Sequence, residues 1–118
     1  MKPAFLVVGV WLALVPLACA RSVEDPFRTL GFDAACAAAR SESKVVMLDF
    51  FTTWCVPCKK LDEVTWKDGS VRAWLAKKTV ALRIDAEAEK ALAERFVVEA
   101  YPSLVFVQPD GKIGRAHV

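Results

Sequence analysis

The sequence has no block of like charge, no internal repeat and no low-complexity segment. Its 16 basic residues are balanced by 14 acidic ones, for a formal net charge of +2. The basic pairs Lys59-Lys60 and Lys77-Lys78 stand alone, and we interpret them as parts of solvated helix faces. This distribution excludes the basic patch of a nucleic-acid-binding protein. The apolar-rich composition also excludes a disordered chain and predicts one folded domain.

Histidine is nearly absent, and this limits the metal and haem sites that the chain can build. A zinc site based on Cys55 and Cys58 would need a second ligand pair, and only Cys36 and His117 are left, neither paired nor suitably spaced. A c-type haem site needs histidine directly after the second cysteine, where this chain has Lys59. We therefore expect no metal and no organic cofactor.

The N-terminus has the pattern of a secretory signal peptide. Lys2 precedes an apolar run over residues 3–20, which ends in the small-x-small sequence Ala18-Cys19-Ala20. We expect residues 1–20 to be a signal peptide, cleaved after Ala20. Two alternatives stay open: a membrane anchor, or lipid attachment at Cys19, although Pro16 stands where bacterial lipoprotein signals usually carry leucine. All three predict a domain outside the cytoplasm, periplasmic or otherwise exported.

The cysteines favour redox chemistry over a disulfide scaffold. If Cys19 leaves with the signal peptide, Cys36, Cys55 and Cys58 remain, too few for a stapled fold. A single close pair in an exported protein suggests thiol chemistry, with a purely structural disulfide as the alternative. Cys36 follows Phe32 by four residues on an expected helix, and we interpret it as a buried core cysteine, with a redox partner as the alternative.

Hydrophobic patterning predicts alternating strands and helices. Residues 21–26 are polar and predict a flexible lead-in, and the apolar run 45–51 suits a strand buried on both faces. We expect Trp66, Trp74 and Phe96 in the core. The predicted helices are 34–42 with Asp33 as N-cap, 57–66, 71–77 with Ser70 as cap, and 87–96. The predicted strands are 27–30, 45–51, 80–84, 103–107 and 112–118, the last after a turn at 109–111.

This order predicts an α/β fold that ends in an antiparallel hairpin. It also places Cys55 and Cys58, three residues apart, at the start of a helix that follows a buried strand. Three residues are nearly one helical turn, so the two sulfurs face each other. Unpaired N–H groups at a helix N-terminus favour the thiolate of the first cysteine, which is the attacking form. Pro57 stiffens the intervening turn, and we expect Trp54 to shield the pair partly.

Two segments resemble those of a known family. Residues 49–59, from Asp49 through Trp54-Cys55-Val56-Pro57-Cys58 to Lys59, resemble the active-site segment of thioredoxins. Residues 101–106, beginning Tyr101-Pro102, resemble the segment that carries their cis-proline. The resemblance spans residues 27–118 and implies a thioredoxin-like fold, a central mixed sheet with flanking helices. Within the superfamily the chain is similar to exported domains such as the C-terminal domain of thiol:disulfide interchange reductases.

The resemblance implies a role for each matching residue. Cys55 would be the nucleophile and Cys58 the resolving thiol. Asp49 would be the buried acid behind them, its pKa raised by burial, and could exchange a proton with Cys58. The alternative for Asp49 is a strand-end acid that faces solvent. The residues expected to contact substrate are Trp54, Pro57, Tyr101 and the cis-proline Pro102, although Tyr101 could serve ordinary packing instead.

The chain departs from thioredoxins in two respects. Thioredoxin pairs its buried acid with a lysine on a neighbouring strand, and the aligned residue here is Ala81. The final helix of the fold is also missing, so we expect a fragment or a trimmed domain with exposed apolar sheet, weakly stable or oligomeric.

The sequence therefore predicts an enzyme of thiol–disulfide exchange. We favour a reductase of exported protein disulfides, recharged by a membrane thiol reductase, with membrane attachment through residues 1–20 left open. The alternatives are an oxidase or isomerase of the same fold, or a thioredoxin-like binding module without turnover.

Overall fold

The computed structural model of the protein describes residues 24–117. The predicted signal peptide over residues 1–20 lies outside the described residues, as does the first half of the predicted lead-in, residues 21–23. Among residues 24–117, no helix combines the length and apolar character needed to cross a bilayer.

The described chain forms four helices and one mixed sheet of four strands, in the order β2-β1-β3-β4. β1 pairs with β2 in parallel, whereas the β1–β3 and β3–β4 pairs are antiparallel. The helices are α1 (Phe32–Glu42), α2 (Val56–Glu63), α3 (Gly69–Lys78) and α4 (Lys90–Arg95). The strands are β1 (Val45–Phe51), β2 (Thr79–Asp85), β3 (Ser103–Val107) and β4 (Ile113–His117). The predicted α/β fold with a C-terminal hairpin is confirmed.

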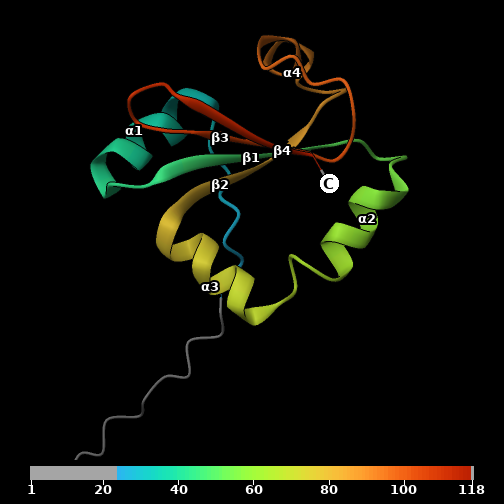
Figure 1. The fold of residues 1–118 in the computed structure, drawn as a ribbon, viewed down its shortest axis with the longest axis horizontal. Helices are drawn as coiled ribbons and strands as arrows, with labels where there is room; N and C mark the ends of the chain where they lie inside the picture. The colour runs from blue at the N-terminus through green and yellow to red at the C-terminus, as the bar shows by residue number, and fades with distance from the viewer. Residues whose placement is uncertain (1–23, 118) are drawn as a thin grey trace, which may run out of the picture.

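Helices cover both faces of the sheet, α1 and α4 on one side and α2 and α3 on the other (Figure 1). Alternate residues of β1 therefore enter two different cores. Val46, Leu48 and Phe50 pack with α1 and α4, whereas Met47 packs with Leu61 of α2. β1 thus borders both cores, which explains why all of its residues except Asp49 are apolar.

The predicted edge strand over residues 27–30 is wrong in extent. Only Phe27 forms a bridge, parallel to Ala81 of β2, and the Arg28 N–H donates to the Ala81 carbonyl at 2.8 Å. The Phe27 ring also meets the Trp66 ring edge to face, with centroids 5.4 Å apart. The segment is thus an irregular stretch that pairs with β2 at one residue, and it is not a strand.

The starts of α1, α3 and α4 differ by two or three residues from their predicted positions. At α3 and before α4 the cause is an aspartate side chain that accepts N–H groups near the predicted start. α1 begins after Gly31, and Asp33 lies in the first turn instead of capping it. α3 begins after Asp68, whose Oδ1 accepts the Val71 N–H at 3.0 Å, so Ser70 is not the cap. α4 begins only at Lys90, because the N–H groups of residues 87 and 88 donate to Asp85 Oδ1 in a turn.

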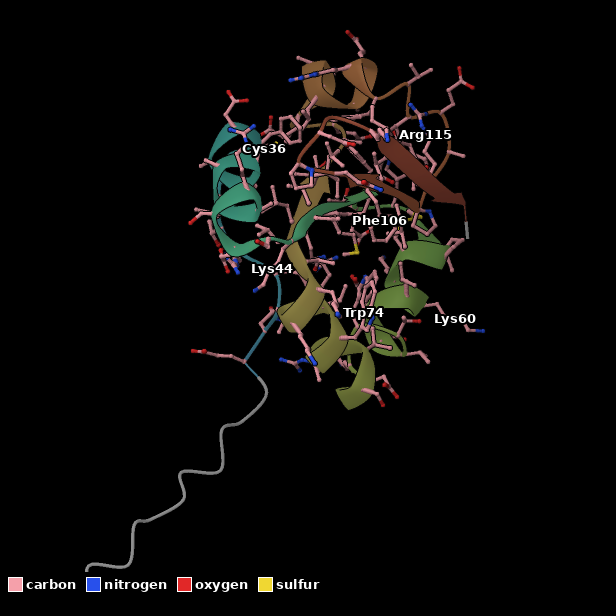
Figure 2. The ribbon with its side chains drawn as sticks, turned by 60° about the vertical axis from the view of Figure 1, so that its left-hand side comes forward. Cys36, Lys44, Lys60, Trp74, Phe106 and Arg115 are labelled. Atoms are coloured by element: carbon pink, nitrogen blue, oxygen red, sulfur yellow. A yellow bond between two sulfur atoms is a disulfide. The ribbon has the colours of Figure 1, made fainter. Side chains whose placement is uncertain are left out.

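Two of the three predicted core aromatics are buried. Trp66 and Phe96 lie in the two cores, but Trp74 is 51 % exposed. On α3, Leu75 points at the sheet, and consecutive helical side chains diverge by about 100°, so Trp74 lies on the flank. Figure 2 shows Trp74 on α3, Phe106 on the sheet and Cys36 on α1.

Candidate active site

Cys55 and Cys58 form a disulfide at the N-terminus of α2. Cys55 is the N-cap residue with extended backbone (φ −77°, ψ 108°), and the Cys58 N–H donates to its Sγ at 3.2 Å. Pro57 occupies the first turn, where its missing N–H leaves no bond unmade. The predicted placement of the pair, one turn apart at a helix start, is confirmed.

The rim around the disulfide is apolar and exposed, although both cysteines are buried. Trp54 and Val56 expose 63 % and 72 % of their surface on either side of Cys55. The Trp54 indole N–H donates to Glu87 Oε1 at 2.8 Å, and its ring meets Tyr101 edge to face at 6.0 Å. The indole is thus held toward Glu87 and Tyr101. Sequence reasoning missed Glu87, because the turn at Asp85 that presents it lies where a helix was predicted.

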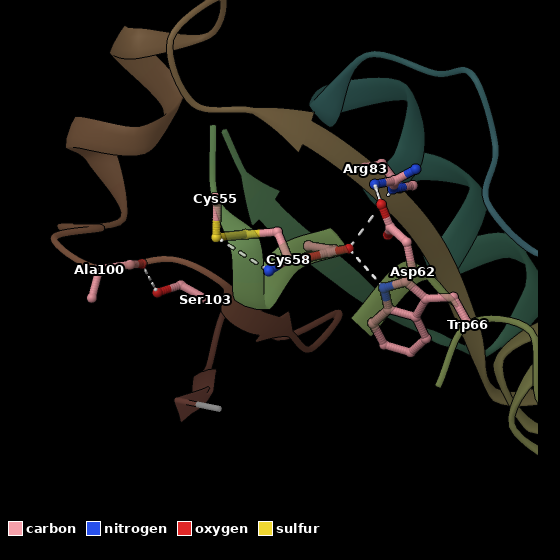
Figure 3. The surroundings of a disulfide bond; sticks show 8 residues. Cys55, Cys58, Asp62, Trp66, Arg83, Ala100 and Ser103 are labelled. Carbon is pink, nitrogen blue, oxygen red and sulfur yellow. Dashed lines mark hydrogen bonds and ion pairs between the residues drawn. A yellow bond between two sulfur atoms is a disulfide. The ribbon is translucent and has the colours of Figure 1, made fainter. Parts of the chain in front are cut away.

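The Tyr101–Pro102 peptide bond is cis, as the resemblance implied. Pro102 is fully buried, and its neighbour Ser103 donates through Oγ to the Ala100 carbonyl at 2.5 Å. Figure 3 places Ala100 and Ser103 in the surroundings of the disulfide. The structure thus brings Tyr101 to Trp54 at the rim and fixes the backbone on either side of Pro102.

Asp49 is buried on the face of the sheet that α2 and α3 cover, with 1 % of its surface exposed. Its Oδ2 accepts the Trp66 indole N–H at 2.9 Å and lies 3.8 Å from Arg83 Nε, while Oδ1 has no hydrogen-bond partner among the described residues. Burial raises the pKa of this carboxyl to about 6, although Trp66 and Arg83 oppose the rise. The alternative of a solvent-facing acid is therefore wrong.

A basic partner for Asp49 exists, but not at the aligned residue. Ala81 pairs with Met47 in the strand register and is buried in the core. Arg83, two residues further along β2, lies directly opposite Asp49. Residues 81 and 83 share one face of the strand, and an arginine inside the apolar run 79–85 was the signal that sequence reasoning left unused.

Arg83 also connects the buried acid to α2. Its Nη2 lies 2.7 Å from Asp62 Oδ2, and both residues are about one-third exposed. Figure 3 shows Arg83, Asp62 and Trp66 together on one side of Cys58. Sequence reasoning missed Asp62, because nothing in the spacing of α2 indicates which strand residue it meets.

Cys36 does not belong to this site. It lies on α1, on the opposite face of the sheet from α2, where it is half-buried against the core. Burial raises the pKa of its thiol. Among residues 24–117, no group of three or more histidine, cysteine or acidic side chains is placed to hold a metal ion.

Comparison with known proteins gives consistent results. A family model described as Thioredoxin-like matches residues 28–109. The chain is 39% identical over 83 residues to the thiol:disulfide interchange protein DsbD of Ralstonia nicotianae. The aligned region covers 67% of this chain and 14% of that protein. It is 32% identical over 73 residues to Thioredoxin-1 of Drosophila melanogaster, covering 62% of this chain and 65% of that one.

Solved structures show the same likeness. A putative disulphide-isomerase from Bacteroides thetaiotaomicron is 38% identical, with a TM-score of 0.66 over 75% of this chain and 76% of that one. The chain spans only a small part of the interchange protein that it matches. The match of the family model over most of the described residues, together with the Cys55–Cys58 disulfide, establishes that the chain belongs to the thioredoxin-like family.

Proposed function

We propose that this chain is a thiol–disulfide exchange enzyme that reduces disulfides of exported proteins through Cys55 and Cys58. One observation carries the proposal: the Cys55 sulfur is the N-cap of α2, accepts the Cys58 N–H and is bonded to the Cys58 sulfur. A thiolate at this position is stabilised by the helix N-terminus, and its resolving partner is already in bonding distance.

The reaction begins with the reduced pair. The Cys55 thiolate attacks one sulfur of the substrate disulfide, which forms a mixed disulfide and releases the other substrate sulfur as a thiolate. The Cys58 thiolate then attacks Cys55 Sγ, which releases the second substrate thiolate. The substrate gains two electrons, and the enzyme is left with the Cys55–Cys58 disulfide.

Asp49 serves the second step as a base. A carboxyl with a pKa of about 6 is mostly ionised at neutral pH yet basic enough to accept the Cys58 proton. Its Oδ1 has no hydrogen-bond partner among the described residues, which leaves one oxygen for that proton. Trp66 holds the other oxygen in place.

The exposed rim serves substrate binding. Trp54 and Tyr101 flank the disulfide, and an extended substrate segment would lie across the cis Tyr101–Pro102 bond. Pro57 completes this surface at the first turn of α2.

The reductive direction, the site of action and the electron donor are part of the same proposal. The Val56-Pro57 spacer resembles reductive members of the family, and relatives include a thiol:disulfide interchange protein and a thioredoxin. We propose that the chain acts outside the cytoplasm, after export through residues 1–20, and receives its electrons from a membrane thiol reductase.

The first test compares insulin reduction by dithiothreitol with wild type, Cys55→Ser and Cys36→Ser. We expect catalysis by wild type and Cys36→Ser, and only the uncatalysed rate with Cys55→Ser. Equal rates for wild type and Cys55→Ser would favour a binding module. The Cys58→Ser variant should retain substrates as mixed disulfides on Cys55.

The second test measures the reduction potential of the Cys55–Cys58 pair against glutathione. Potentials in this superfamily span roughly 150 mV, from thioredoxin to the strong oxidant DsbA. A potential near that of thioredoxin supports a reductase, and one near that of the strong oxidants would contradict the proposed direction.

A further inference from the structure

The guanidinium of Arg83 is held in one place by three neighbours. Its Nη2 lies 2.7 Å from Asp62 Oδ2, and its central carbon lies 4.7 Å from the centroid of the Phe51 ring and 5.8 Å from that of Phe27. A planar cation between aromatic rings and a carboxylate loses little freedom when it makes a further contact. The further contact is Asp49, whose Oδ2 lies 3.8 Å from Arg83 Nε.

Few other charges act on Asp49. Arg83 faces it from β2 and Asp62 acts on it from α2, while its register partner on β3 is the uncharged Leu104. Trp66 contributes a neutral N–H, and the surface hollow that Arg83 and Asp62 border is also lined by the charged residues Asp25, Lys67 and Arg72. Because Arg83 pairs with Asp62 at hydrogen-bond distance, it neutralises the one acid on α2 that disfavours ionisation of Asp49.

On the basis of the proposed exchange reaction, we propose that Arg83 is a positioning residue that keeps the buried Asp49 ionised at neutral pH, ready to accept the proton of Cys58. It acts in two ways. It attracts the Asp49 carboxylate directly, and it cancels the charge of Asp62. An uncharged residue at position 83 would remove the cation that pairs with both carboxylates.

Trp66 provides a reporter of this effect that does not depend on activity. Its indole N–H donates to Asp49 Oδ2, so its NMR signal follows the ionisation of that carboxyl. The chain has four tryptophans, and the Trp66 signal is assigned by removing the others with Trp11→Phe, Trp54→Phe and Trp74→Phe. The titration uses the full oxidised chain, in which neither Cys55 nor Cys58 titrates.

We expect Arg83→Gln to raise the midpoint of the Trp66 titration by about one pH unit or more, since an adjacent opposite charge shifts a carboxyl by that amount. Arg83→Lys, which keeps the charge, should recover most of the wild-type midpoint. Asp62→Asn should lower the midpoint, because it removes the acid that Arg83 offsets. An unchanged midpoint in Arg83→Gln overturns the proposal. Should Arg83→Gln fail to fold, an unchanged midpoint in Asp62→Asn overturns it instead.

Arg95 provides the matched control. Its guanidinium lies 5.0 Å from the centroid of the Phe32 ring and 5.7 Å from that of Phe96, much as Arg83 lies over Phe51, but these two rings belong to the core on the opposite face of the sheet. Arg95→Gln should leave the Trp66 midpoint unchanged. An equal shift in Arg95→Gln would mean a general loss of structure and would contradict a specific role for Arg83.

The catalytic consequence is measured separately, as the pH dependence of disulfide reduction. In Arg83→Gln the acidic limb of the pH–rate profile should move to higher pH by the same amount as the Trp66 midpoint. In a protein that already carries Asp49→Asn, adding Arg83→Gln should not shift the profile further. If wild type fails to reduce disulfides, the proposed function fails, whereas the Trp66 titration still decides the role of Arg83.

Discussion

Val97 adopts a left-handed backbone conformation with φ of 52°, although it is β-branched and 60 % exposed. It ends the turn after α4, where its N–H donates to the Glu94 carbonyl at 3.0 Å. Its own carbonyl accepts from Arg115 Nη1 at 3.4 Å, so the chain is held on both sides. This conformation suits glycine and costs other residues roughly 1–2 kcal/mol.

Val97→Gly should therefore stabilise the protein. The relief of backbone strain exceeds the extra chain entropy of glycine in the unfolded state, and we expect a gain of about 0.5–1 kcal/mol in the free energy of unfolding. Urea denaturation measures this gain. Val64→Gly is the matched control, because Val64 is 61 % exposed with an ordinary φ of −110°, and it should destabilise. Loss of stability in Val97→Gly would contradict the strain.

At the residue scale, local pattern predicted the parts of the site that lie close in sequence. The placement of Cys55 and Cys58 could be predicted because the strand, turn and helix around them are consecutive. The buried Asp49 was predicted only through the resemblance to thioredoxins. Glu87 and Arg83 could not be predicted, since their partners Trp54 and Asp49 lie on other elements. Which residues meet across a sheet depends on strand register, and register is set by packing.

At the element scale, helix starts depend on which of several polar side chains captures the first N–H groups. Asp68 and Ser70 both have the chemistry of an N-cap, and the structure assigns α3 to Asp68. The hydrogen bond from the Val71 N–H also lowers the pKa of the Asp68 carboxyl. A charged acceptor at a helix N-terminus gains from the helix dipole as well.

Asp68→Ala should destabilise the protein by about 1 kcal/mol, because it leaves the Val71 N–H without its acceptor. Thermal denaturation followed by circular dichroism measures the loss. Ser70→Ala is the paired control and should cost clearly less. The assignment of the cap would be wrong if Ser70→Ala were the more harmful of the two.

Strands were predicted more closely than helices, and β1 and β3 have the predicted bounds. A run of buried apolar residues marks a strand along its whole length. The position of a helix end, by contrast, depends on which residue makes the capping hydrogen bond. α4 illustrates the difference, because a turn at Asp85 takes up residues that are compositionally helical. The short helix that results leaves Glu87 beside Trp54.

At the scale of the whole molecule, Asp49 makes stability depend on pH. Its pKa is about 6 in the folded protein and 3.8 in its ordinary state, so between these values the folded state binds more protons than the unfolded state. The free energy of unfolding should therefore fall as pH rises from about 4 to about 6.

Asp49→Asn should remove this fall and stabilise the protein at neutral pH by about 2–3 kcal/mol, since each pKa unit corresponds to about 1.4 kcal/mol. The asparagine oxygen can still accept the Trp66 N–H. Urea denaturation of wild type and variant at pH 4 and pH 7 measures the difference. Parallel pH dependence in the two proteins would contradict a buried, ionised Asp49.

Glu42 has the opposite effect on the pH dependence of stability, because its pKa is lowered in the folded protein. Hydrogen bonds from Arg28, at 2.7 and 2.8 Å, and from Lys44, at 3.1 Å, lower its pKa to about 2. The ionised Glu42 carboxylate therefore stabilises the folded protein at pH values above its ordinary pKa of 4.5, and this stabilisation is lost as the pH falls toward about 2. The Arg28–Glu42 pair also ties the segment before α1 to the end of that helix.

The sequence by itself determined the order of elements, the buried central strand, and the cysteine pair at a helix start, because each depends on residues near one another along the chain. Only the tertiary structure decided that Arg83 and Asp62 surround the buried acid and that Glu87 holds Trp54. These contacts join β1, β2, α2 and the turn before α4. Their partners are chosen by strand register and helix packing, which no local pattern of residues encodes.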